Sequence, residues 1–356
     1  MVQVGPETEQ RTGGRGSAEG EIGQAPAGHS GLADRKVVDD DVVVRDHRGY
    51  EDLLHRCRDG AALSTAVVYP VDDLSLAAAA EAAERGIIEP ILVGPVEIMH
   101  EAAEAAGLDL SRFRLVDTPD EATAAAAAVG LARDGRVAML MKGDLHTAAL
   151  LGAVMERVSG LRGTRRISHV FVFDVPTYPK PLLVTDAVVN IAPNLAHKAD
   201  ICRNVIDVAH AIGIEEPKVA ILSAVEIVDP AIPSTLDAAA LCKMADRGQI
   251  VGAVLDGPLA MDNAISVRAT RNKHIASPVS GHADVLIVPN LEAGNILYKN
   301  LTYLAEADAA GVVVGARVPI ILASRADSVR TRIASAALAS ILCHAGGRAE
   351  VRSRAR

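Results

Sequence analysis

The chain has 356 residues, of which 36 are Lys or Arg and 45 are Asp or Glu, so its formal charge is −9. This acidic balance, with only 2% aromatic residues, argues against nucleic-acid binding, which needs basic patches and stacking surfaces. The four cysteines form no Cys-x-x-Cys pair, and no apolar run reaches the roughly 20 residues of a membrane span. We therefore expect no metal site, no membrane partner and a cytoplasmic location.

The first 45 residues are rich in Gly, Glu and Pro and contain few large apolar side chains. Such a segment cannot bury enough surface to offset the entropy lost on ordering. We expect residues 1–45 to form a disordered tail, with periodic structure beginning near Tyr50.

Short apolar strands then alternate with Ala-rich helices as far as about residue 160. The expected strands are Ser64–Tyr69, Pro90–Val93, Phe113–Asp117 and Arg136–Met141, and the expected helices are Leu74–Arg85, Val96–Ala106 and Pro119–Arg133. This alternation predicts α/β architecture with a parallel sheet and right-handed crossovers.

A second group of elements begins after Arg166. It comprises strands at His169–Asp174, Leu182–Asn190, Lys218–Ser223, Ile250–Asp256, Asp284–Pro289 and Val318–Ala323, and helices at Asn194–Ile212, Ser234–Asp246 and Ser328–His344. We expect the first two strands to pair antiparallel. The break near Gly160–Gly163 is the best domain boundary, and the sequence alone assigns everything after it to a second domain.

Two late strands each run into a small polar loop that opens a helix, and such strand ends hold anionic ligands in open α/β folds. The loop after Val318–Ala323 contains Ser324, Arg325 and Asp327. As local structure, Ser324 is an N-cap with Asp327 as its capping-box partner. As chemistry, Arg325 and the helix N-terminus surround a phosphate or an oxyanion. The motif alone favours neither interpretation.

The strand Arg136–Met141 leads into a second polar loop. Lys142 supplies a cation, Gly143 permits close backbone approach, and Thr147 can donate a hydrogen bond at the start of a helix. The alternative is an ordinary helix entry, in which His146 is a surface residue. Further along, Asp256-Gly257-Pro258 is typical of a turn.

The segment Ser277–Ser328 resembles the phosphate acetyl/butyryltransferase family, whose recurring pieces include SGxADxLxVPxxEAGN and a strand that ends in Ser-Arg. The chain is most similar to the acyltransferase half of bifunctional enoyl-CoA hydratase/phosphate acetyltransferase proteins. The resemblance implies two three-layer α/β domains with an interdomain cleft, the isocitrate/isopropylmalate dehydrogenase-like fold. It returns the C-terminus to the first domain, so that residues 46–163 plus 315–356 form domain I and 164–314 form domain II.

The resemblance also implies an activity, the movement of a short acyl group (acetyl or butyryl) between phosphate and coenzyme A. The thiolate would attack the acyl phosphate directly, with coenzyme A as cosubstrate, no bound cofactor and a homodimeric protein. The family's active-site serine and arginine match Ser324 and Arg325, but the position of its aspartate base is Thr331 here. Asp327 is the nearest carboxylate. The implied substrate-binding residues are Lys142, Gly143, His146, Thr147, Asp262, Asn263, Gly294, Asn295 and Lys299.

Two alternatives stay open at this point. One is a non-catalytic regulatory module that binds acyl-coenzyme A, since the family's aspartate and an arginine near the start of the helix Leu74–Arg85 are both absent. The other is an oxidoreductase on a related fold. The sequence does not reveal the acyl chain length or the general base.

Overall fold

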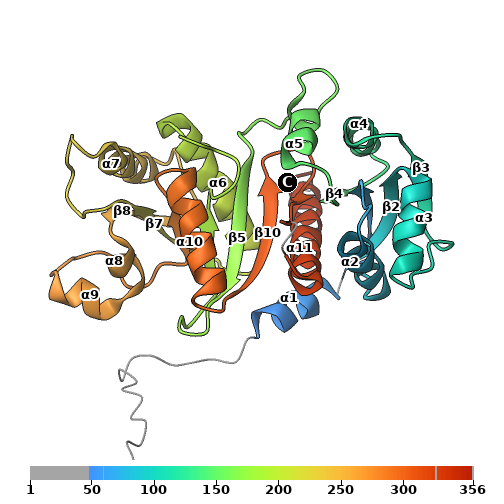
Figure 1. Ribbon diagram of the computed structural model, residues 1–356. Helices are drawn as coiled ribbons and strands as arrows, with labels where there is room; N and C mark the ends of the chain where they lie inside the picture. The colour runs from blue at the N-terminus through green and yellow to red at the C-terminus, as the bar shows by residue number, and fades with distance from the viewer. Residues whose placement is uncertain (1–47, 59, 325–326, 355–356) are drawn as a thin grey trace, which may run out of the picture. The chain divides into compact units, whose positions relative to one another are not determined.

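The computed structural model describes residues 48–58, 60–324 and 327–354 of the chain (Figure 1). The predicted tail at residues 1–45 and the predicted site residue Arg325 lie outside the described residues.

The described strands form one 11-stranded sheet in the order β3-β2-β1-β4-β11-β10-β5-β6-β9-β7-β8. They are β1 (Leu63–Val68), β2 (Ile88–Gly94), β3 (Arg114–Asp117), β4 (Met139–Lys142), β5 (Ser168–Asp174), β6 (Leu182–Thr185), β7 (Lys218–Leu222), β8 (Val254–Leu259), β9 (Val285–Ile287), β10 (Asp308–Val314) and β11 (Ile320–Ile321). β3, β2, β1, β4 and β11 are parallel, as are β6, β9, β7 and β8. Antiparallel pairing of β10 with β11 and β5, and of β5 with β6, joins these two blocks.

Helices connect the parallel strands, as the alternating sequence predicts. They are α1 (Gly49–Cys57), α2 (Asp73–Glu84), α3 (Val96–Ala105), α4 (Glu121–Arg133), α5 (Thr147–Met155), α6 (Leu195–Ala211), α7 (Pro233–Asp246), α8 (Met261–Ile265), α9 (Val267–Asn272), α10 (Leu291–Tyr303) and α11 (Val329–Arg354). Side chains cap the N-termini of several of these helices. Asp72 accepts a hydrogen bond from the backbone of Ser75 at α2, and Asn290 accepts one from Ala293 at α10.

Side chains that alternate along the strands enter different cores, because successive residues of a strand point to opposite faces. In β1, Val67 joins a core that also contains residues of α2, α6 and α11. Its neighbours Ala66 and Val68 join a second core with α4 and α5. A third core packs β5 and β6 against α10. These short apolar runs are therefore buried on both faces, as parallel strands are expected to be.

The C-terminal segment returns to the first half of the chain. β11 pairs in parallel with β4, with Ile320 opposite Leu140 and Ile321 opposite Met141. α11 packs against α1 and α2, and it lies beside them in Figure 1. The division into domains at 46–163 plus 315–356 and at 164–314 stays a prediction.

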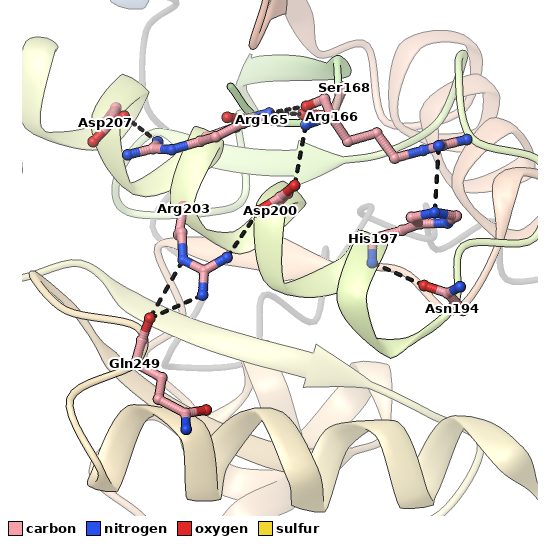
Figure 2. Close-up of polar contacts among 10 residues, drawn as sticks. Arg165, Arg166, Ser168, Asn194, His197, Asp200, Arg203, Asp207 and Gln249 are labelled. Carbon is pink, nitrogen blue, oxygen red and sulfur yellow. Dashed lines mark hydrogen bonds and ion pairs between the residues drawn. The ribbon is translucent and has the colours of Figure 1, made fainter. Parts of the chain in front are cut away.

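Polar contacts tie α6 to the residues that lead into β5 (Figure 2). Arg165 forms an ion pair with Asp207 at 2.6 Å, and the backbone N–H of Arg166 donates to Asp200 at 3.1 Å. Arg203 binds both Asp200, at 2.8 Å, and the carbonyl of Gln249, at 2.9 Å. These partly exposed contacts each contribute little to stability.

Two features differ from the sequence-based expectations. Asp308–Val314 forms the central strand β10, which the sequence did not predict. Asp256-Gly257-Pro258 lies within β8 and forms no turn. β8 ends the sheet, and an edge strand tolerates a proline because no further strand needs its missing N–H. Among the described helices, none combines the length and apolarity required to cross a membrane.

Candidate active site

A cavity of about 380 Å³ opens between β4, β11 and α10. Its apolar wall consists of Leu145, Phe171, Val188, Leu322 and Ala323, and its polar wall of Lys142, His146, Thr147, Asn295, Tyr298, Lys299, Ser324 and Asp327. Leu145 and Leu322 belong to the second core, whereas Phe171 and Tyr298 belong to the third. The cavity therefore lies where these two cores meet.

The pairing of β4 with β11 brings the two predicted loops together. Lys142 ends β4, and Ser324 follows β11 by three residues. Because parallel neighbours end at the same edge of a sheet, the lysine–glycine loop and the serine loop both reach the cavity. These segments are more than 180 positions apart in the chain, so no local pattern could have shown that they meet.

Lys142 is a buried cation in the cavity wall, with only 3% of its surface exposed. Its ammonium group donates to the carbonyl of Gly143 at 3.1 Å. Gly143 lies against the end of β1, where an added Cβ would approach the carbonyl oxygen of Tyr69 to 2.5 Å. Gly143 thus lets this loop turn close to β1, and it does not itself line the cavity.

His146 and Thr147 stand at the start of α5, and both line the cavity. Glu121, the first residue of α4, holds His146 through two contacts. The backbone N–H of His146 donates to its carboxylate at 2.9 Å, and the Nδ1 atom lies 3.0 Å from the same oxygen. The imidazole is thus oriented by a carboxylate, which differs from an unconstrained surface histidine.

The serine loop is closed by its own hydrogen bonds. The Ser324 N–H donates to Oδ2 of Asp327 at 2.6 Å, and the Asp327 N–H donates to the Ser324 carbonyl at 3.1 Å. The expectation that Ser324 caps the last helix is wrong. α11 begins at Val329, and the Ser328 hydroxyl accepts the hydrogen bond from the backbone of Thr331.

Arg332 clamps this loop from α11. It is buried, with 2% of its surface exposed, and it donates to the carbonyl oxygens of Ser324 at 3.0 Å and Asp327 at 3.3 Å. A third contact reaches the hydroxyl of Ser75 in α2 at 3.5 Å. The sequence lacks an arginine near the start of α2, and here a guanidinium from α11 occupies that neighbourhood.

Aromatic rings form the floor of the cavity beside Asp327. The Tyr298 ring stacks on Phe171 with centroids 4.3 Å apart, and its hydroxyl donates to Oδ1 of Asp327 at 3.1 Å. His169 lies behind Phe171, with ring centroids 4.2 Å apart, and it is completely buried. Burial lowers the pKa of His169 to about 4, although the carboxylates of Asp186 and Asp327 oppose this shift. His169 is therefore neutral near pH 7.

Three predicted residues lie on α10. Asn295 lines the cavity and donates to the carbonyl of Ala187 at 3.4 Å. Lys299 also lines it, with its ammonium 4.7 Å from the centroid of the Tyr298 ring. Gly294 lies behind the wall, where an added Cβ would come within 2.9 Å of the Cα atom of Ala187. Gly294 therefore allows close packing of α10 and makes no contact with the cavity.

Asp262 and Asn263 lie on α8 and are not among the described residues that line the cavity. Asp262 forms an ion pair with Lys273 at 3.1 Å. The Asn263 side chain is buried and donates to Glu226. The structure thus joins them to a separate polar cluster, and their predicted role in substrate binding stays a prediction.

Thr331, at the position of the family's aspartate, is not among the described residues that line the 380 Å³ cavity. It lines a separate cavity of about 90 Å³ under α1, together with Arg330 and Ala334. Asp327 is consequently the carboxylate nearest Ser324 among the described residues of the cavity wall. Across the described part of the chain, no group of three or more His, Cys, Asp or Glu side chains is arranged to hold a metal ion.

The sequence analysis did not select Phe171, Val188, Tyr298 or Arg332 as site residues. One signal was available for Phe171, because two of the chain's three phenylalanines fall in the single strand β5. Arg332 sits in an apolar helix face, where a lone charge suggests a specific partner. The position of Val188 depends on the conformation of its loop, in which backbone N–H groups donate hydrogen bonds to the Asp186 carboxylate.

Comparison with known proteins identifies the family of the chain. Residues 120–340 match the family described as phosphate acetyl/butaryl transferase. The chain is 57% identical to a phosphate acetyltransferase of Rhizobium meliloti over 292 residues, covering 82% of this chain and 92% of that protein. It is 43% identical to a phosphate butyryltransferase of Clostridium beijerinckii over 295 residues, covering 83% and 98%.

A solved structure agrees in fold. A branched-chain phosphotransacylase from Enterococcus faecalis V583 superposes with a TM-score of 0.70 at 30% identity, covering 79% of this chain and 99% of that one. The predicted fold class is confirmed, and the comparisons lend no support to a regulatory module or an oxidoreductase. The chain therefore belongs to the phosphate acetyl/butyryltransferase family and is an acyltransferase enzyme.

Proposed function

We propose that the 380 Å³ cavity is the site at which a short acyl group passes between phosphate and coenzyme A. The observation that supports this most is the mixed lining. Lys142, Lys299 and His146 line the same cavity as an apolar wall, which suits a phosphate attached to a small acyl chain. Arg325 lies outside the described residues, and its role in charge stabilisation stays a prediction.

The chemistry is a direct transfer. The coenzyme A thiol gives its proton to the Asp327 carboxylate, and the sulfur attacks the carbonyl carbon of the acyl phosphate. The new C–S bond forms, the bond between the carbonyl carbon and the bridging oxygen breaks, and inorganic phosphate leaves with that oxygen and the electron pair. Lys142 and Lys299 stabilise the charge on the departing phosphate, and Ser324 hydrogen-bonds the thiol or the carbonyl oxygen.

The proposal includes a homodimer and a cytoplasmic location. α10 and its C-cap residue expose apolar side chains at Ile296, Tyr303 and Leu304, with 63%, 63% and 81% of their surfaces accessible, and a second subunit would cover them. All four cysteines are free thiols, as expected in a reducing compartment. Sedimentation of the full chain and cell fractionation test these two statements.

The central experiment measures consumption and release of the coenzyme A thiol with acetyl, propionyl and butyryl phosphates. We expect Lys142→Met to raise KM for the acyl phosphate roughly 10- to 100-fold, because a charge-assisted contact to phosphate is lost. Lys243→Met is the matched control. This lysine lies on α7, pairs with Asp246 and is 66% exposed, so KM should not change. Absence of coenzyme A-dependent turnover in the unaltered protein would overturn the proposed function.

A further inference from the structure

Both oxygens of the Asp327 carboxylate are held by hydrogen-bond donors. Oδ2 accepts from the Ser324 N–H at 2.6 Å within the loop, and Oδ1 accepts from the Tyr298 hydroxyl at 3.1 Å. The second donor comes from α10, so the carboxylate is tied to both sides of the cavity. A carboxylate held at two points has one fixed plane, which a base needs in order to meet a thiol in a productive geometry.

The Tyr298 hydroxyl is itself held rigidly. Its ring is buried, with 6% exposure, and stacks on Phe171 at an interplanar angle of 6°. The Phe173 ring lies beside it, with ring centroids 6.2 Å apart, and the Lys299 ammonium lies 4.7 Å from the centroid of the Tyr298 ring. With the ring fixed by these contacts, the only group that Tyr298 directs at the Ser324–Asp327 loop is its hydroxyl.

The protonation states suit a donor facing an anion. Burial, and then the negative charge of Asp327, raise the pKa of Tyr298, so the phenol keeps its proton at neutral pH. The other titratable groups that face this pair are Lys142, His146, His169, Lys299, Tyr303 and Arg332, from β4, α5, β5, α10 and α11. Of these, none is a carboxylate that would compete for the Tyr298 hydroxyl.

We infer that Tyr298 is a positioning residue, which orients the Asp327 carboxylate for uptake of the thiol proton. This inference rests on the proposed function. Tyr298 therefore acts through Asp327 and takes no proton from the substrate.

The test is Tyr298→Phe in the full-length protein, which removes the hydroxyl and keeps the stacked ring. We expect kcat to fall about tenfold, since a general base contributes roughly 10²–10⁴-fold in total. KM for coenzyme A and for acetyl phosphate should change less than about twofold.

A double-mutant cycle tests whether Tyr298 affects kcat through Asp327. If Tyr298 acts through Asp327, Tyr298→Phe causes no further loss in an Asp327→Asn background. Tyr178→Phe is the matched control, since its buried hydroxyl donates to the carbonyl of Ala283 at 2.6 Å, away from the cavity. We expect its kcat to equal that of the unaltered protein, and thermal melts confirm that each variant is folded.

Three results would overturn the inference. They are an unchanged kcat in Tyr298→Phe, an equal loss of kcat in the presence and absence of the Asp327 carboxylate, and a rise in KM alone. Failure of the proposed function looks different. In that case the unaltered protein shows no coenzyme A-dependent turnover, or Asp327→Asn leaves kcat unchanged.

Discussion

Arg332 offers the sharpest test of how the fold supports the site. Its guanidinium is buried and joins the two ends of the Ser324–Asp327 loop through their carbonyl oxygens, at 3.0 and 3.3 Å. Replacing it with methionine keeps much of the volume and removes the donors. The loop then loses the side chain that fixes both Ser324 and Asp327 at the cavity.

Two opposing effects determine how much the Arg332→Met substitution changes the free energy of unfolding. A hydrogen bond from a charged donor contributes about 1.5–3 kcal/mol, and two carbonyl oxygens lose such a donor. Against this, no carboxylate of the described residues forms an ion pair with Arg332, so removing its charge relieves a desolvation cost. We expect a net loss of about 2–3 kcal/mol in the free energy of unfolding. We expect kcat to fall roughly 100-fold, because a displacement of about 1 Å in catalytic groups has this effect.

Urea unfolding measures the loss in the free energy of unfolding, and the thiol assay measures the fall in kcat. Arg330→Met removes the same charge from the same helix at an exposed position. There Arg330 pairs with Asp308 at 3.1 Å and lies over the Tyr50 ring. The Arg330→Met substitution should lower the free energy of unfolding by about 1 kcal/mol and leave turnover unchanged. The reasoning fails if Arg332→Met unfolds and turns over like the unaltered protein, or if both arginine variants behave alike.

Two further predictions concern buried residues around the cavity. Because burial lowers the pKa of His169 to about 4 and an unfolded histidine titrates near 6.5, the unfolded chain binds the extra proton between these values. The free energy of unfolding should therefore fall as pH drops through this window, by about 2 kcal/mol at pH 5. His169→Phe should abolish this component in urea titrations at pH 7 and pH 5, and an unchanged pH dependence would contradict the assignment. Gly143→Ala should lower the free energy of unfolding by roughly 1–3 kcal/mol, since the Cβ of the alanine would meet the backbone oxygens of Tyr69 and Val68 at 2.5 and 2.6 Å. Gly152→Ala, on α5 with no atom within 4 Å, is the control and should be neutral or slightly stabilising in the same unfolding assay.

Elements with strong local patterns were predictable. Val, Ile and Leu runs bounded by turn residues gave β1, β2 and β7, and the Ala-rich segments gave α2 and α4, within a few residues of their observed bounds. β10 escaped prediction because its sequence DAAGVVV is half small residues. Gly311 is accommodated there because the His169 ring fills the space, with its Cε1 atom 2.8 Å from where a Cβ would stand. That reason exists only once β5 lies beside β10.

The candidate site was likewise predictable only in part from the sequence. The residues after β4 and β11 could be proposed from the sequence, since polar loops at strand ends are local features and the family motif marks them. Their meeting depends on the pairing of β11 with β4, which burial of both strand faces enforces. The family resemblance also marked Asp262 and Asn263, whose side chains contact Lys273 and Glu226 in the fold.

The sequence by itself determined the α/β class, the family and the serine and lysine loops, because each depends on residues close together in the chain. The tertiary structure decided which distant side chains complete the cavity, including Tyr298, Phe171 and Arg332. The physical reason is that a hydrogen bond or a ring contact between remote segments exists only after the core has packed, and a one-dimensional pattern carries no record of it.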